Sequence, residues 1–311
     1  MLVSKAASTR MNKRTMRKML FMDAKKAHLN PLCHEDVYIM LPEEVGAGPG
    51  RCGKLVHWLY GCRPAAQAWE SFYAEKIEEV GFERGKGSAV VFYHKEKDIS
   101  ALVHEDDFVF VGDDEELTWI QELVKSWFEV KVRGRLSGEK GDVREMTILG
   151  REIRWTEEGL EYEADRRHRT KVLEHFGFGK DTAGVVTNGG RGTKAEEEEE
   201  EAEGEELTKE EKKAFRGMAA LLNFYSQDCP DTQFLAKEVS RDMAKPRMKS
   251  WAKVKRVAKY LVGRDSVVWK FRWQEEEQTM SVWTDSDWGG RFGGRRKGWS
   301  TRRIGGIGKR C

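Results

Sequence analysis

The apolar positions of this chain form short runs that end on charged residues, most clearly around residues 104–107. Apolar residues on both sides of His104-Glu-Asp-Asp107 predict two short strands joined by a tight hairpin, with the charged tetrapeptide at its tip. Another apolar strand is predicted at residues 19–23 and ends on Asp23. Carboxylates are costly to bury where a strand should be apolar, so these acids are candidates for chemistry.

Helical spacing accounts for much of the rest of the chain. In several segments apolar residues recur every three or four positions, the period of an amphipathic helix. Two segments also open on helix caps, namely Asp165 and the capping box that Thr208 forms with Glu211. Helices are predicted at residues 65–80, 115–128, 165–176, 208–225, 231–243 and 249–262. Further strands are predicted at residues 90–93, 101–111, 146–155, 160–162, 267–273 and 279–284.

Composition is that of a folded protein with two or three domains. The chain has 311 residues, of which 39% are hydrophobic and 35% are charged. No apolar run is long enough to span a membrane and no signal peptide opens the sequence. We therefore expect an intracellular protein, in the cytoplasm or nucleus, with no membrane partner. The five cysteines lack Cys-x-x-Cys spacing and are expected to be free thiols.

The net charge is +2, but the charged residues are distributed unevenly along the chain. Nine glutamates and one lysine give residues 194–206 a balance of −8, which by subtraction leaves about +10 for the remainder. Such a run cannot bury apolar area, so residues 179–207 are predicted to form an acidic disordered linker. The basic excess lies in residues 1–26 and 291–311. It suits either a nucleic-acid backbone or a solvated surface.

The aspartates at the predicted strand ends could share one chemical task. Asp23, Asp106 and Asp107 offer the carboxylate oxygens that Mg²⁺ prefers. Two such ions can clamp the attacking and leaving oxygens of a phosphoryl transfer. Carboxylates that lie close together repel one another unless a cation neutralises them. For Asp23 taken alone, a turn or a helix cap is the simpler interpretation.

Several motifs between about residue 19 and residue 290 resemble the reverse transcriptase of Ty1/copia-type retrotransposons. The stretch Phe21-Met-Asp-Ala-Lys-Lys-Ala-His-Leu-Asn30 is similar to that family's first palm motif, and Leu59-Tyr-Gly-Cys-Arg-Pro-Ala-Ala-Gln-Ala-Trp69 to its second. His104-Glu-Asp-Asp107 takes the place of its Tyr-Val-Asp-Asp box, and Ile148-Leu-Gly-Arg-Glu-Ile153 resembles its primer-grip strand. Segments that resemble the connection and the opening of the ribonuclease H domain are residues 225–231, 251–261 and 284–290.

The resemblance implies an α+β fold in four parts. Residues 1–178 would form the palm and thumb, an antiparallel sheet with packed helices, with the fingers largely missing. Residues 179–207 would be the acidic linker and residues 208–263 a helical connection. Residues 264–311 would be a truncated ribonuclease H-like start with a basic tail. Ribonuclease H activity is not expected, because Asp285 would lack most of its partner carboxylates.

The same resemblance implies a reaction and its partners. Asp23, Asp106 and Asp107 would hold two Mg²⁺ ions, with Mn²⁺ as an alternative, for RNA-directed DNA polymerisation. His28 and Arg63 would lie at the incoming dNTP. An RNA template and a DNA primer would be the other partners, and the oligomeric state is left open.

Departures from the family pattern keep a second interpretation open. His28 stands where the family has an aromatic side chain next to the sugar. Pro64, Ala66 and Gln67 replace the Gln, Pro and Arg of the second motif. Because the fingers would be largely missing and the second motif has changed, polymerisation is expected to be impaired, and whether the chain acts as an enzyme stays open. The alternative is a non-catalytic retroelement remnant that binds nucleic acid or is inert.

Overall fold

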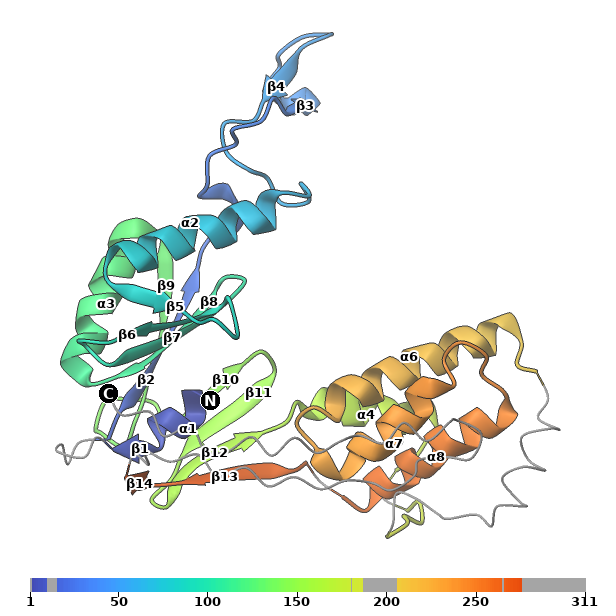
Figure 1. Ribbon diagram of the computed structural model, residues 1–311. Coiled ribbons are helices and arrows are strands. Elements are labelled where there is room, and N and C mark those ends of the chain that lie inside the picture. The colour runs from blue at the N-terminus through green and yellow to red at the C-terminus, as the bar shows by residue number, and fades with distance from the viewer. Residues whose placement is uncertain (1, 10–15, 180, 187–205, 265, 276–311) are drawn as a thin grey trace.

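The computed structural model describes residues 2–9, 16–179, 181–186, 206–264 and 266–275. Within these ranges the chain mixes helices with antiparallel sheets, as the α+β prediction required. Figure 1 shows a six-stranded sheet covered by two helices, a smaller sheet beside it, and a separate cluster of helices. No helix in the described part is long and apolar enough to cross a membrane.

The six-stranded sheet is antiparallel throughout. In spatial order its strands are β5 (Phe82–Arg84), β6 (Val91–His94), β7 (Ile99–His104), β8 (Asp107–Gly112), β2 (Lys18–Ala24) and β9 (Val130–Leu136). Helices α2 (Ala65–Glu79) and α3 (Asp114–Trp127) cover one face (Figure 1). Both helices lie within two residues of their predicted bounds.

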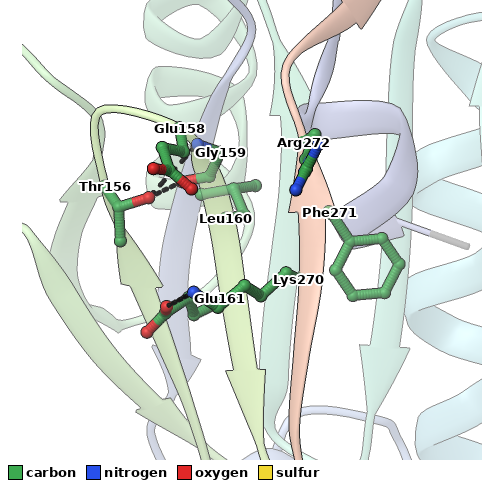
Figure 2. Close-up of a pocket in the computed structure, with 8 residues that line it drawn as sticks. All are labelled: Thr156, Glu158, Gly159, Leu160, Glu161, Lys270, Phe271 and Arg272. Carbon is green, nitrogen blue, oxygen red and sulfur yellow. Dashed lines mark hydrogen bonds and ion pairs between the residues drawn. The ribbon is translucent and has the colours of Figure 1, made fainter.

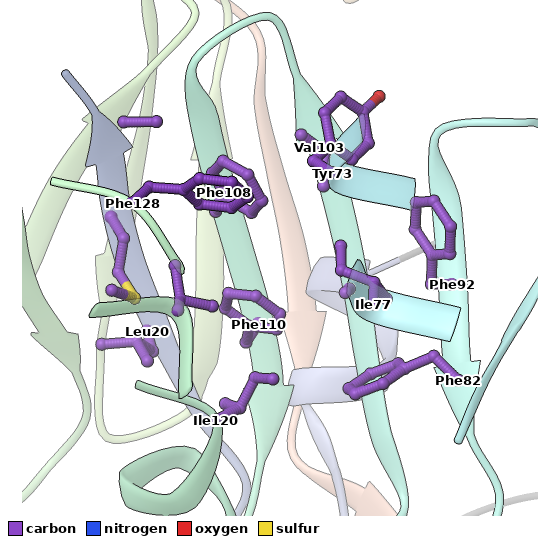
Figure 3. Packing of buried hydrophobic residues seen from close by; sticks show 14 of the residues in the cluster. Leu20, Tyr73, Ile77, Phe82, Phe92, Val103, Phe108, Phe110, Ile120 and Phe128 are labelled. Atoms are coloured by element: carbon purple, nitrogen blue, oxygen red, sulfur yellow. The ribbon is translucent and has the colours of Figure 1, made fainter. Parts of the chain in front are cut away.

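Alternation along the central strands divides the core between two faces. On β2, Leu20 and Met22 pack towards α2 and α3, whereas Met19 and Phe21 belong to a second apolar cluster on the opposite face. Figure 3 shows the first cluster, in which Phe108 and Phe110 of β8 meet side chains from both helices. Fully burying one such side chain contributes roughly 1.5–3 kcal/mol, so this layer fixes the register of the central strands.

A four-stranded antiparallel sheet packs on the opposite face. Its strands in spatial order are β10 (Glu145–Ile148), β11 (Arg151–Trp155), β12 (Gly159–Glu163) and β13 (Val268–Arg272). The strand expected at residues 267–273 is β13, and it pairs with β12. Residues 279–284 lie outside the described ranges.

The backbones of β12 and β13 approach so closely that position 159 requires a glycine. Gly159 has a φ of +157°, and a Cβ there would overlap the carbonyl oxygen of Phe271 and lie 2.8 Å from the Cα of Arg272. Figure 2 shows the shallow hollow beside this contact. There Thr156 forms hydrogen bonds with the backbone of Gly159, and Lys270 forms an ion pair with Glu161. No candidate site residue lines this hollow.

The N-terminal segment forms short elements that pack on the rest of the fold where the structure describes it. Helix α1 (Leu2–Ala6) packs between the two sheets, and β1 (Ser8–Thr9) pairs in parallel with β14 (Gln274–Glu275). Arg17 is almost fully buried and its Nη2 donates to Asp98 at 2.8 Å. A buried guanidinium needs such a carboxylate, so this ion pair anchors the segment.

The helices of the C-terminal half form one apolar cluster. They are α4 (Arg166–His175), α6 (Lys209–Tyr225), α7 (Pro230–Arg241) and α8 (Met248–Val262). The predicted capping box is confirmed, since Thr208 and Glu211 bond each other's backbone amides. Helix α4 thus packs with the helices of the expected connection, although the sequence had placed it with the palm and thumb.

Part of the predicted acidic linker is ordered. Residues 181–186 lie against α8, where the amide of Val185 donates to the carbonyl of Lys259 at 3.2 Å. For these residues the expectation of disorder was wrong, because Val185 is apolar and joins the helical cluster. The glutamate-rich residues 187–205 lie outside the described ranges.

A narrow ribbon extends from the end of β2 to the start of α2 (Figure 1). It contains the short helices η1 (Ala27–Leu29) and η2 (Glu43–Val45) and the paired strands β3 (Tyr38–Met40) and β4 (Cys52–Lys54). Its apolar side chains are largely exposed, and Met40 is 92% accessible. The ribbon carries the candidate residues His28 and Arg63 near its two ends.

Candidate active site

Pairing of the central strands brings two of the predicted aspartates together. Asp23 near the end of β2 and Asp107 at the start of β8 are direct cross-strand partners in the antiparallel register. Directly opposed residues of a sheet point to the same face. Alternation from Phe21 and Val109 places both carboxylates on the face opposite α2 and α3. Both residues are partly buried.

The third aspartate occupies the hairpin tip. β7 ends on His104, which pairs with Asp107, so Glu105 and Asp106 form the turn and the predicted hairpin is confirmed. Two bonds hold this turn in place. The amide of Ala24 donates to the carbonyl of Asp106 at 2.8 Å, and the indole Nε1 of Trp69 donates to the carbonyl of Glu105 at 2.7 Å.

Arg133 is a site residue that the sequence analysis missed. Its Nη1 donates to Oδ1 of Asp107 at 3.3 Å, and its Nη2 donates to the carbonyl of Thr147 on β10. Met22 faces Val132 and Phe21 faces Gly134, so Arg133 is the extra residue of a β-bulge in β9. The glycine at position 134, with a φ of +141°, is the only sequence signal that marks this irregularity.

Burial and charge act together on Asp107. Burial raises the pKa of its carboxyl above the usual value, Arg133 opposes that effect, and repulsion from Asp106 and Asp23 adds to it. Lys131 faces Asp23 from the other neighbouring strand, but its side chain is exposed. The site is therefore a patch of excess negative charge with one guanidinium in contact with it.

The donor set fits a hard divalent cation that is completed by other ligands. Asp23 and Asp107 supply carboxylate oxygens from adjacent strands, and Mg²⁺ in phosphate-transfer sites is often held by one or two carboxylates together with waters and substrate phosphates. Within the described ranges, no group of three or more His, Cys, Asp or Glu side chains forms a ready metal cluster. These residues would therefore hold the ion only with such further ligands.

The two predicted nucleotide-side residues lie at the base of the ribbon. The His28 ring stacks on Tyr60 with ring centroids 4.5 Å apart, which brings η1 next to the segment before α2. Arg63 is exposed in that segment. Among the described contacts, no hydrogen bond or ion pair joins either side chain to the three aspartates.

A hollow of about 430 Å³ opens beside Arg133. Its floor includes the tight β10–β11 turn, where Leu149 has a φ of +48° and Gly150 a φ of +77°. Arg166 and Arg167 from the start of α4 also line it, and they are paired with Glu163 and Asp165 respectively. The lining includes Arg133, Thr147, Leu149, Gly150, Arg166 and Arg167. The carboxylate patch thus borders a hollow that is lined by three arginines and by the acids Glu152 and Asp165.

Comparison with known proteins adds little to this geometry. No protein-family model matches the chain, and no curated protein matches it. Among solved structures it is similar to an apo telomerase from Candida tropicalis, truncated from its C-terminal domain, with 11% identity and a TM-score of 0.28. That match covers 44% of this chain and about a third of the telomerase chain, 34% of its length. Similarity at this level does not establish a shared fold.

The segment that resembles a ribonuclease H opening lies outside the described residues. It spans residues 284–290 and includes Asp285. The described part of the chain therefore contains the candidate polymerase residues only.

Proposed function

We propose that the chain is a retrotransposon-derived, RNA-directed DNA polymerase of the Ty1/copia type, impaired in activity. The observation that carries this proposal is the cross-strand pairing of Asp23 with Asp107 where β2 and β8 meet, with Asp106 at the adjoining tip. The sequence separates these acids by more than eighty residues, and the sheet register places them at one edge of the central strand pair. Such convergence of carboxylates is what two-metal nucleotidyl transfer requires.

In this proposal each aspartate acts on the cations. Asp23, Asp106 and Asp107 would hold two Mg²⁺ or Mn²⁺ ions, which when bound neutralise charge on the reacting phosphate. Arg63 and His28 would position the dNTP from the base of the ribbon. The primer and the RNA template would lie along the arginine-lined hollow, because guanidinium groups favour phosphate oxygens.

One observation favours a second candidate, a non-catalytic remnant that binds nucleic acid. Asp107 already has a cationic partner, Arg133, and a guanidinium in that place competes with a metal ion. The losses in the second motif, including Pro64, act in the same direction. This alternative keeps the basic surfaces and their binding but removes the chemistry.

Primer extension separates the two candidates. The purified chain is incubated with a labelled DNA primer on an RNA template and dNTPs, first with Mg²⁺ and then with Mn²⁺. We expect slow extension that falls by roughly 10²-fold or more in Asp106→Ala, the loss typical of removing one electrostatic contact to the reacting group. Asp36→Asn, an exposed ribbon residue paired with Lys54, is the matched control and should extend normally.

The other outcomes are equally informative. Extension that is unchanged in Asp106→Ala would exclude these carboxylates as the catalytic centre. If neither cation supports extension but the chain still shifts the primer–template duplex at low salt, the non-catalytic remnant is the better description. Absence of both extension and binding would indicate an inert fragment.

A further inference from the structure

We infer that Arg133 is an internal counter-cation of the carboxylate patch, which a divalent cation must displace from Asp107 before the metal site is complete. The inference rests on the proposed function, since it concerns the same carboxylates. It adds a residue that sets how tightly the site binds its cation. The basis is a contact within this chain, and the first palm motif and the hairpin box do not include Arg133.

The bulge in β9 is what directs the guanidinium to the patch. In a regular strand, a residue between Val132 and Gly134 would alternate with its neighbours and pair with β2. Here Met22 faces Val132 and Phe21 faces Gly134, which leaves Arg133 without a backbone partner on β2. Bulges of this kind bend a strand and redirect one side chain, often beside active sites.

Two contacts then hold the side chain on the acidic face. One guanidinium nitrogen donates to Asp107 and the other to the carbonyl of Thr147, so the group is bridged between the two sheets. The side chains of Arg133 and Asp107 are 28% and 17% exposed, so water screens the pair only in part. By contrast, Arg135 reaches the opposite face of the sheet and bonds Asp114 at 2.7 Å.

A divalent cation and Arg133 would compete for the same carboxylate of Asp107. The Oδ1 oxygen of Asp107 accepts the guanidinium bond, and a hard cation at the Asp23–Asp107 pair would require the carboxylate oxygens. Breaking the contact therefore reduces the observed cation affinity by the strength of the ion pair. Replacing Arg133 with a neutral side chain should recover that affinity, about twofold to fivefold for a partly exposed pair.

Binding of Mn²⁺ alone, followed by the loss of the free-ion EPR signal, tests this without any turnover. Arg133→Gln keeps a donor for Thr147 but removes the charge, and we expect it to bind Mn²⁺ about twofold to fivefold more tightly than the wild type. Arg133→Lys should remain near the wild type because it keeps the charge. Arg135→Gln is the matched control on the same strand and should leave the affinity unchanged. Circular dichroism confirms that each variant is folded.

Asp23→Asn distinguishes failure of this inference from failure of the proposed function. If Asp23→Asn weakens Mn²⁺ binding while Arg133→Gln binds like the wild type, the cation site exists and the role of Arg133 is overturned. Weaker binding in Arg133→Gln would also overturn it. If Asp23→Asn binds Mn²⁺ as well as the wild type does, the carboxylates are not the cation site, and the proposed function falls as well.

Discussion

Like charges on neighbouring strands dominate the site at the residue scale. Asp23 and Asp107 face each other across β2 and β8, a pairing that destabilises a sheet in the absence of a cation. Burial is the main cause of the raised pKa of Asp107, and its two aspartate neighbours add to it against the pull of Arg133. The fold therefore maintains an electrostatically unfavourable arrangement, which is common where a ligand later relieves it.

This arrangement predicts a stabilising substitution. Because the pKa of Asp107 is raised on folding, the folded chain holds more protons than the unfolded chain as the pH rises above the usual carboxyl value of 3.8, so the free energy of unfolding falls there. Asp23→Asn removes part of the repulsion. It should increase the free energy of unfolding at neutral pH by about 0.2–1 kcal/mol. It should also make the decrease of that free energy with rising pH smaller.

Urea denaturation at low salt across the acidic and neutral range measures both effects. Asp36→Asn changes the net charge equally but lies in an exposed ion pair, so it should not stabilise the chain. A neutral-pH stability of Asp23→Asn below that of the wild type would contradict the proposed repulsion.

The sequence allowed some residues of the site to be predicted and others not. Asp23, Asp106 and Asp107 could be singled out because acids at the ends of apolar strands are unusual. Arg133 could not, because its position depends on a bulge between β2 and β9, and Gly134 alone does not show which residue is the extra one. His28 and Arg63 were named from the resemblance, and their roles stay predictions.

At the element scale, helix α2 supports the hairpin that carries the acids. Trp69 is 2% exposed, packs edge-on against Phe108, and donates its indole N–H to the tip carbonyl of Glu105. Trp69→Phe keeps most of the ring but leaves the Glu105 carbonyl without this donor. We expect a loss of about 1 kcal/mol in the free energy of unfolding.

Comparing Trp69→Phe with Trp69→Ala separates the contribution of the hydrogen bond to stability from that of side-chain packing. Removing the whole side chain should cost about 3–5 kcal/mol, since a cavity is left in the aromatic cluster. Trp127→Phe on α3 is the control, because none of the described hydrogen bonds joins Trp127 to the tip. Equal losses for Trp69→Phe and Trp127→Phe, measured by chemical denaturation, would show that the tip bond contributes nothing.

Elements with strong periodicity could be located from the sequence, but not their partners. The helices at 65–80, 115–128, 208–225, 231–243 and 249–262 were predicted to within one or two residues at most ends. The strand at 267–273 was also found, yet its pairing with β12 across more than a hundred residues was not. Helical contacts repeat locally, whereas strand pairing depends on distant chain segments.

On the scale of the whole molecule, Asp228 links the helical cluster to the smaller sheet. It lies between α6 and α7, and its carboxylate accepts from Nε of Arg151 and from the Tyr162 hydroxyl, each at 2.9 Å. Its carbonyl accepts from the indole of Trp269 on β13 at 2.7 Å. Burial, followed by this carboxylate, raises the pKa of Tyr162 to about 12.

Loss of this link should destabilise the chain as a whole. Asp228→Ala leaves Arg151 and Tyr162 without their shared acceptor, and we expect a loss of about 1–3 kcal/mol in the free energy of unfolding. The control is Asp242→Ala, which removes an equal charge from an ion pair with Lys253 inside the helical cluster. A loss no larger than that of the control, in the same denaturation measurement, would show that the two parts are held together by other contacts.

The sequence by itself determined the apolar strands, the amphipathic helices, the capped start of α6 and the acids at strand ends, because each of these depends on residues close in the chain. Only the tertiary structure decided which strands pair, and hence that Asp23 meets Asp107, that Arg133 contacts Asp107, and that α4 joins the later helices. Those choices depend on burying apolar faces from distant segments together, and no local pattern specifies which faces meet.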